Sequence, residues 1–83
     1  MLENLSQPQR DRLAFIDLRL RMLGELKRQH LIERFDIQEA AASRDIALYK
    51  TLSKHNLVYD ASSRLYKPSE SFKSLFDPTA EHA

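Results

Sequence analysis

The sequence contains no cysteine and a single glycine, Gly24, among its 83 residues. The lack of cysteine excludes disulfide bonds, thiolate metal sites and cysteine nucleophiles. A single glycine also excludes a glycine-rich loop that binds phosphate. The histidines, His30, His55 and His82, lack the mutual spacing of metal ligands. We therefore expect no metal, no cofactor and no enzymatic activity, because so short a chain also leaves little room for an active-site cleft.

Long apolar runs are absent as well. No stretch approaches the roughly 18 consecutive apolar residues of a membrane-spanning helix, and the amino terminus has no basic segment followed by an apolar one. We expect a cytoplasmic protein that does not enter a membrane. The formal net charge is only +1. If the chain binds phosphates, its positive charge must therefore be concentrated locally.

Length and composition predict one globular domain over residues 1–83. A chain of this size has no room for a second domain, and a hydrophobic share of 42% is too high for a disordered chain. Such a chain buries only about 60% of its unfolded surface, so its stability is marginal and a partner subunit would add to it. We place the core at about residues 8–67 and a carboxy-terminal amphipathic segment at residues 69–77.

The first predicted element is a helix from Gln9 to Leu23. This stretch is rich in Leu, Arg and Met, which favour helices. Ser6 can cap the amino terminus of the helix, and Pro8 is tolerated in its first turn. Gly24 supplies a left-handed residue that ends the helix.

The apolar residues of this helix fall on two opposite sides at about 100° per residue. The first stripe consists of Leu13, Ile16, Leu20 and Leu23. The second stripe consists of Phe15, Leu18 and Met22. Charged residues, including Asp17 and Arg21, are expected on the flanks between the stripes. Because a surface helix normally has one apolar face, this helix requires two packing partners.

The domain core is the first partner. The second stripe is expected to pack against a second subunit or against a short amphipathic segment near the carboxyl end. The candidate dimer interface therefore comprises Phe15, Leu18, Met22, Phe72, Leu75 and Phe76.

Two further helices are predicted over residues 27–35 and 39–53, with a tight turn at 36–38 between them. In the later helix, Ala42, Ile46 and Tyr49 have the spacing of core residues. Asp45 lies at the edge of that stripe, where a bare carboxylate would be costly to bury. We expect Asp45 to pair with an Arg of the first helix or to accept hydrogen bonds from backbone N–H groups.

After residue 56 the pattern changes from helical to alternating. Residues 57–59 and 65–67 are predicted strands, joined by a polar turn at 60–64, and Pro68 ends the second strand. Three helices followed by a hairpin, with a tight turn before the third helix, is the element order of a winged helix-turn-helix. The predicted fold is therefore mostly α with a small β-hairpin, the wing.

In this architecture the third helix enters the major groove of DNA and the wing follows the phosphate backbone. Small residues on the outer face of the third helix let its backbone approach the bases, and basic residues at the start of the second helix are placed for phosphates. The candidate DNA-binding residues are Lys27, Arg28, Gln29, Gln38, Glu39, Ala40, Ser43, Arg44, Lys50, Ser62, Ser63, Arg64 and Lys67. The same residues would also suit an ordinary solvated surface, so this assignment depends on the fold.

The run RLAFIDLRL at residues 12–20 resembles the first helix of the amino-terminal domain in WYL-domain transcriptional regulators. The resemblance is closest to the group that represses phage-defence loci such as BREX and CBASS. It continues through LIERF at 31–35, ASRDI at 42–46 and NLVYD at 56–60, together with Tyr49 and Tyr66. It covers about residues 10–76.

This resemblance implies a winged helix-turn-helix that binds inverted-repeat DNA as a homodimer. Members of the group continue into a WYL domain that is thought to sense a ligand, and this chain resembles only their DNA-binding third. We expect it to be either an excised fragment or a free-standing short protein. Members commonly have Gly-Ile-Ser at the turn before the third helix, where this chain has Asp36, Ile37 and Gln38.

We therefore predict sequence-specific binding to double-stranded DNA by the DNA-binding domain of a bacterial transcriptional repressor. In a homodimer the half-sites would lie about one helical turn apart, ~34 Å, or a multiple of that. One alternative is a winged helix that serves protein contact and dimerisation through the second stripe of the first helix. Another is a small antagonist that forms mixed dimers with a full-length regulator.

Overall fold

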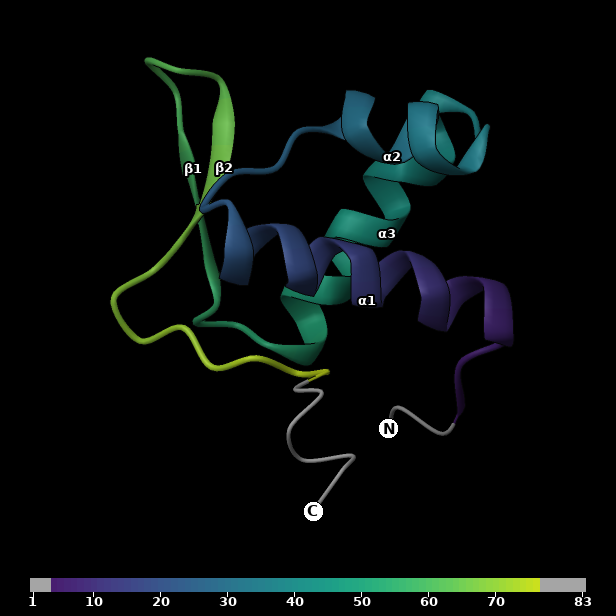
Figure 1. The fold of residues 1–83 in the computed structure, drawn as a ribbon, viewed down its shortest axis with the longest axis horizontal. Helices are drawn as coiled ribbons and strands as arrows, with labels where there is room; N and C mark the ends of the chain where they lie inside the picture. Colours follow the sequence, from purple (N-terminus) through teal and green to yellow (C-terminus); the bar gives the residue numbers. More distant parts are fainter. Residues whose placement is uncertain (1–3, 77–83) are drawn as a thin grey trace.

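The computed structural model describes residues 4–76. In chain order the elements are α1 (Gln7–Met22), α2 (Arg28–Phe35), α3 (Glu39–Leu52), β1 (Leu57–Asp60) and β2 (Leu65–Pro68). Three helices followed by a two-stranded antiparallel hairpin confirm the predicted winged helix-turn-helix. In Figure 1, α1 crosses the front of the molecule with α3 behind it, and the hairpin and α2 rise on opposite sides.

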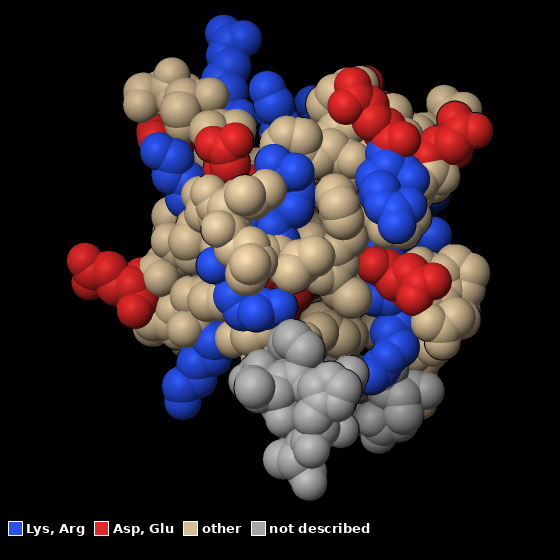
Figure 2. Space-filling model, in the orientation of Figure 1, with Lys and Arg blue, Asp and Glu red and all other residues tan. Residues whose placement is uncertain are grey.

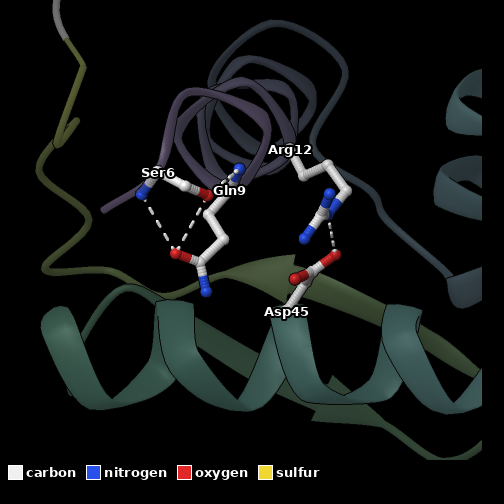
Figure 3. A network of polar contacts seen from close by, with 4 residues as sticks. All are labelled: Ser6, Gln9, Arg12 and Asp45. Carbon is white, nitrogen blue, oxygen red and sulfur yellow. Dashed lines mark hydrogen bonds and ion pairs between the residues drawn. The ribbon is translucent and has the colours of Figure 1, made fainter.

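The amino terminus of α1 is fixed by a capping box (Figure 3). The Ser6 hydroxyl accepts a hydrogen bond from the Gln9 backbone N–H at 3.3 Å, and the Gln9 side chain accepts one from the Ser6 backbone N–H at 3.1 Å. Two backbone donors that no helical carbonyl can reach are thereby satisfied. As a result α1 begins at Gln7, directly after the predicted Ser6 cap, and not at Gln9.

At the other end, α1 stops at Met22, and Gly24 has the predicted left-handed backbone with φ of 71°. Leu23 was expected to continue the core stripe, and this prediction is wrong. Leu23 is the residue that caps the carboxyl end, and it is 61% exposed.

The core lies where α1, α3, the start of α2 and the hairpin meet. Its fully buried apolar residues are Leu13, Ile16, Leu20, Leu26, Leu31, Ala42, Ile46, Tyr49 and Leu57. The predicted core residues of α3 are all among them. The tight turn before α3 contains Asp36 in the left-handed region, with φ of 53°. Asp tolerates this backbone, which explains why the turn forms here without glycine.

Asp45 pairs with an arginine of α1, as predicted. Arg12 Nε lies 2.5 Å from Asp45 Oδ2, and Figure 3 shows the two side chains bridging α1 and α3. The Asp45 carboxylate is almost fully buried, and Arg12 is largely covered. The pair therefore joins α1 to α3 at a largely covered position.

Asp17 is buried, and the prediction that it lies on a polar flank of α1 is wrong. Its carboxylate accepts hydrogen bonds from the Tyr49 hydroxyl at 2.5 Å, from the Ser74 hydroxyl, and from the backbone N–H groups of Leu75 at 2.9 Å and Phe76 at 3.1 Å. Burial and the neighbouring Asp17 carboxylate raise the pKa of Tyr49, so its hydroxyl remains a donor. Asp17 thus joins α1 to α3 and to the segment that follows the hairpin.

Asn56 extends this network. Its side-chain amide donates to the Tyr49 hydroxyl at 3.0 Å and to the Lys73 carbonyl at 2.6 Å, and it accepts from the Lys73 N–H at 2.8 Å. Residues 69–76 form turns, bends and irregular chain, and the helical spacing of Phe72, Leu75 and Phe76 does not produce a helix. Residue 77 of the predicted amphipathic segment lies outside the described residues. In Figure 1 this yellow segment passes back beneath α1.

The second stripe of α1 is only partly covered. The Phe15 ring packs edge-on against Phe35, with 5.4 Å between ring centroids. Leu18 is 45% exposed and Met22 is 65% exposed. Phe72, Leu75 and Phe76 pack against the core cluster instead of covering these two residues. The predicted contact of the second stripe with another subunit stays a prediction.

The hairpin is tied to the connection between α1 and α2. Its register pairs Leu57 with Pro68 and Asp60 with Leu65, so each strand extends one residue beyond the prediction. Leu26 adds an antiparallel bridge to Tyr66, with N–H···O distances of 2.9 and 2.8 Å. The hairpin therefore has a fixed position beside the start of α2.

Within residues 4–76, none of the helices combines the length and apolar character needed to cross a membrane.

Candidate nucleic-acid interface

A groove of about 540 Å³ lies between the outer face of α3, the start of α2 and the hairpin. Its lining residues are Lys27, Arg28, Ser43, Ile46, Ala47, Lys50, Tyr59, Arg64 and Tyr66. Four of these residues are basic and none is acidic. The groove brings together five of the candidate DNA-binding residues from three separate segments. Positive charge is thus concentrated here even though the net charge is only +1.

Charges of both signs are mixed on the face that carries α1, where Figure 2 shows Lys and Arg interspersed with Asp and Glu. At the upper edge, between the positions of the hairpin and α2 in Figure 1, basic side chains project outward. The four basic residues that line the groove would attract an anionic ligand.

The start of α2 is held in place by a local hydrogen bond. Lys27 has an extended backbone and occupies the cap position, so α2 begins at Arg28 and not at Lys27 as predicted. The Lys27 N–H donates to Nδ1 of His30 at 3.1 Å, and the His30 N–H donates to the Lys27 carbonyl at 3.0 Å. This turn presents Lys27 and Arg28 to the groove.

Arg28 links α2 to the outer face of α3. Its Nη1 donates to the Glu39 carboxylate at 3.1 Å and to the Ser43 hydroxyl oxygen at 3.2 Å. Glu39 and Ser43 are one helical turn apart, so a single guanidinium nitrogen reaches both. The contact neutralises part of the negative charge at the amino end of α3.

The other candidates on the helices differ in their placement. Ala40, Arg44 and Lys50 are exposed on α3, and Lys50 alone of these three lines the groove. Gln38 is the cap of α3 but makes no capping bond through its side chain. The Gln29 amide donates to Glu33 at 3.2 Å along the exposed side of α2 and does not line the groove.

The wing turn is organised around Asp60. Its carboxylate accepts from the Ser62 and Ser63 hydroxyls at 2.8 and 2.9 Å, and Lys67 Nζ lies 3.0 Å away. The Lys67 ammonium and these serine hydroxyls hold the pKa of Asp60 well below its ordinary range. The structure therefore uses Ser62, Ser63 and Lys67 to shape the turn, and none of the three lines the groove.

Arg64 closes this turn with a left-handed backbone, φ 60°. For a residue with a Cβ this conformation is unfavourable by roughly 1–2 kcal/mol, and glycine would relieve it. The Arg64 side chain, which glycine would lack, lines the groove. Backbone strain of this kind is common at binding sites.

Two tyrosines of the groove were not among the candidates from the sequence. Tyr59 and Tyr66 are paired across the hairpin, with ring centroids 5.0 Å apart. Strand alternation was the available signal, because it places Tyr59 on the same face as the buried Leu57. Tyr59 lies closer to the tip of the hairpin, beyond the core, and is 54% exposed.

Comparison with known protein families identifies the family of this chain. Residues 8–82 match the family described as the BrxR transcriptional regulator winged helix-turn-helix domain. The chain belongs to this family. This match covers nearly the whole chain and confirms the resemblance to the amino-terminal domain of such regulators.

Curated relatives of this BrxR-type domain are named DNA-binding transcriptional repressor CapW. The Pseudomonas aeruginosa protein is 44% identical over 72 residues, covering 87% of this chain and 24% of the relative. The Stenotrophomonas maltophilia protein is 43% identical over 67 residues, covering 81% of this chain and 22% of the relative. An Escherichia coli protein is 41% identical over 68 residues, covering 82% of this chain and 23% of the relative. The chain thus spans about a quarter of the length of these relatives.

Acidification is expected to loosen the start of α2 in this BrxR-type domain. Burial, followed by the charges of Arg19 and Lys27, lowers the pKa of His30 from its ordinary value of about 6.5. The folded state therefore favours neutral His30, whose Nδ1 accepts from Lys27. Below pH of about 6.5 the unfolded chain binds this proton more readily, so stability falls as the pH drops through this range. Thermal midpoints measured between pH 7.5 and 5 would show the decrease.

Replacing His30 by glutamine is the matched control. Gln is the usual residue at this position of a capping box, and its side-chain oxygen accepts without titrating. Subtracting the His30→Gln profile from that of the unaltered chain removes the contribution of other ionisable groups. Identical pH profiles for both proteins would contradict the assigned role of His30.

Proposed function

We propose that this chain binds double-stranded DNA, with α3 in the major groove and the hairpin along the phosphate backbone. The observation that carries the proposal is the groove, in which Lys27, Lys50 and Arg64 converge from three segments beside the exposed face of α3. Cations gathered on a surface with small residues suit a polyanion whose bases must be approached closely. The strained Arg64 backbone supports a role for its side chain at this surface.

We further propose that the domain acts in transcriptional repression, as part of a regulator similar to the DNA-binding transcriptional repressors named CapW. This role would place it in the bacterial cytoplasm, where the chromosome lies. The resemblance to repressors of phage-defence loci suggests that the regulated genes are of that class.

For sequence recognition we propose a homodimer on an inverted repeat, with half-sites ~34 Å apart or a multiple of that. The support is the exposed apolar side of α1, where Leu18 is 45% and Met22 is 65% accessible. Burial of these two side chains in a second subunit would stabilise the pair. Sedimentation velocity should give a dimer for the unaltered chain and a folded monomer for Leu18→Asp/Met22→Asp. A monomer in both cases would contradict the dimer.

Binding to a duplex from upstream of the gene should weaken steeply with salt. Three groove cations per chain, Lys27, Lys50 and Arg64, are free of acidic partners in the described residues. If each neutralises one phosphate, a rise in salt of about fourfold lowers the affinity by about 40-fold per chain. Fluorescence anisotropy of a labelled duplex at several salt concentrations measures this slope.

The single strand of the same sequence is the control for this titration. A protein that inserts a helix into the major groove should prefer the duplex, because one strand offers no such groove. The absence of salt-sensitive binding to any duplex, or equal affinity for single strand and duplex, would contradict the proposed function.

A further inference from the structure

Glu39 is the first residue of α3, and it carries a negative charge on the surface proposed to meet DNA. Its side chain is 68% exposed. A free carboxylate there would repel phosphates. Arg28 Nη1 lies 3.1 Å from Glu39 Oε1, so the guanidinium offsets this repulsion locally.

The ion pair contributes little to folding. Both partners are at least half exposed, and exposed pairs add between zero and about 1 kcal/mol to stability. Arg28 also donates to the Ser43 hydroxyl oxygen, one turn further along α3. The guanidinium thus holds two side chains of α3 in defined positions on its outer face.

We propose that Glu39 recognises a cytosine in the major groove and that Arg28 is the residue that positions its carboxylate. This inference rests on the proposed function. Residues at the amino end of a recognition helix are the ones that reach base edges, and a carboxylate can only accept hydrogen bonds. Cytosine presents its N4 amino donor, whereas adenine sets the N7 acceptor beside its amino group, which repels a carboxylate. The acceptor on α3 therefore selects cytosine.

Ser43 complements this acceptor. Its oxygen accepts from Arg28, so the hydroxyl proton is free to donate. Because Glu39 and Ser43 lie on one face of α3, they present an acceptor and a donor in adjacent turns. A donor next to the cytosine contact fits a base or phosphate oxygen on the neighbouring nucleotide.

The experiment starts from a pool of duplexes with a randomised centre. The preferred duplex and all its single-pair variants are then measured by anisotropy with the unaltered chain and with Glu39→Ala. We expect Glu39→Ala to lose about tenfold of its discrimination at one C·G pair. Its affinity for unrelated duplexes should stay the same or rise, because a negative charge is removed.

Arg28→Ala and Arg28→Lys test the positioning role. Arg28→Ala should lose discrimination at the same C·G pair, whereas Arg28→Lys should retain part of it, because lysine keeps the charge that faces Glu39. Lys27→Ala is the matched control, since this neighbouring residue lines the same groove, whereas the ion pair of Glu39 in the described residues is with Arg28. It should weaken binding to all duplexes evenly. Circular dichroism of each variant confirms that the fold is kept.

The outcomes separate this inference from the function on which it rests. No duplex binding by the unaltered chain contradicts the proposed function and the inference together. Duplex binding in which Glu39→Ala and Glu39→Gln keep full discrimination at every base pair contradicts the inference alone. Loss of discrimination in Arg28→Ala at a different base pair from Glu39→Ala would refute the positioning role.

Discussion

Replacing Asp17 by alanine should lower the free energy of unfolding by about 3–5 kcal/mol. The carboxylate accepts from Tyr49, Ser74 and the backbone of Leu75 and Phe76. Its removal leaves the buried Tyr49 hydroxyl and three partly buried donors without this acceptor, and each unsatisfied group is costly. Small domains have only about 5–15 kcal/mol of stability in total. Urea unfolding followed by circular dichroism measures the change.

Asp11→Ala is the matched control, because it removes the same side chain from an exposed position of the same helix. Among the described residues Asp11 accepts only from the Gln7 amide, so its loss should change stability by less than about 0.5 kcal/mol. Tyr49→Phe removes one donor of the network and should fall between the two, at about 1–2 kcal/mol. If Asp17→Ala unfolds at the same urea concentration as Asp11→Ala, the network does not hold the fold.

Reversing the charge of Lys50 should weaken duplex binding by at least about tenfold. The slope of log affinity against log salt concentration should also decrease in magnitude by about one, because one phosphate contact is lost. Lys50 is exposed on α3 and lines the groove. A glutamate at this position would replace attraction to a phosphate with repulsion, while leaving the buried face of α3 unchanged. Anisotropy titrations of Lys50→Glu over a range of salt concentrations give both quantities.

Lys73→Glu produces the same change in net charge at a distance from the groove. Lys73 is exposed in the segment after the hairpin, where its backbone bonds to Asn56. Its replacement should leave duplex affinity nearly unchanged. Equal weakening by Lys50→Glu and Lys73→Glu would mean that overall charge, and not the groove, governs binding.

The order of elements could be predicted from the sequence because local signals mark each boundary. Ser6 and Gly24 frame α1, and the change from helical to alternating periodicity marks the hairpin. The partner of Asp45 was also predictable in kind, since a carboxylate at the edge of a core stripe requires a cation or N–H donors. These inferences concern neighbours within a helix or the general cost of burial.

The role of Asp17 could not be predicted in this way. Its four donors come from α3 and from residues 74–76, and no local pattern shows that this late segment folds back against α1. The same contact explains why Phe72, Leu75 and Phe76 form no helix. The backbone N–H groups of Leu75 and Phe76 bind a carboxylate, whereas in a helix they would bind carbonyls.

The candidate interface was predictable only as a list of residue types on exposed faces. Which of them share a groove depends on the crossing of α3 with α2 and on the position of the hairpin. Lys50 and Arg64 meet there, whereas Lys67 is engaged by Asp60. The Arg28 contact with Glu39 arises because α2 begins opposite the first turn of α3, which a helical projection of either helix alone does not reveal.

The bridge between Leu26 and Tyr66 has a consequence for how a duplex is accepted. Leu26 is followed at once by Lys27 on one wall of the groove, and Tyr66 lies on the other. Two backbone hydrogen bonds therefore set the spacing of the walls before any ligand arrives. Contact groups held at a preset separation lose little entropy on association. In the proposed complex, α3 and the hairpin would meet the duplex at this fixed separation, so sequences that deform easily to fit it should be favoured even at base pairs that no side chain touches.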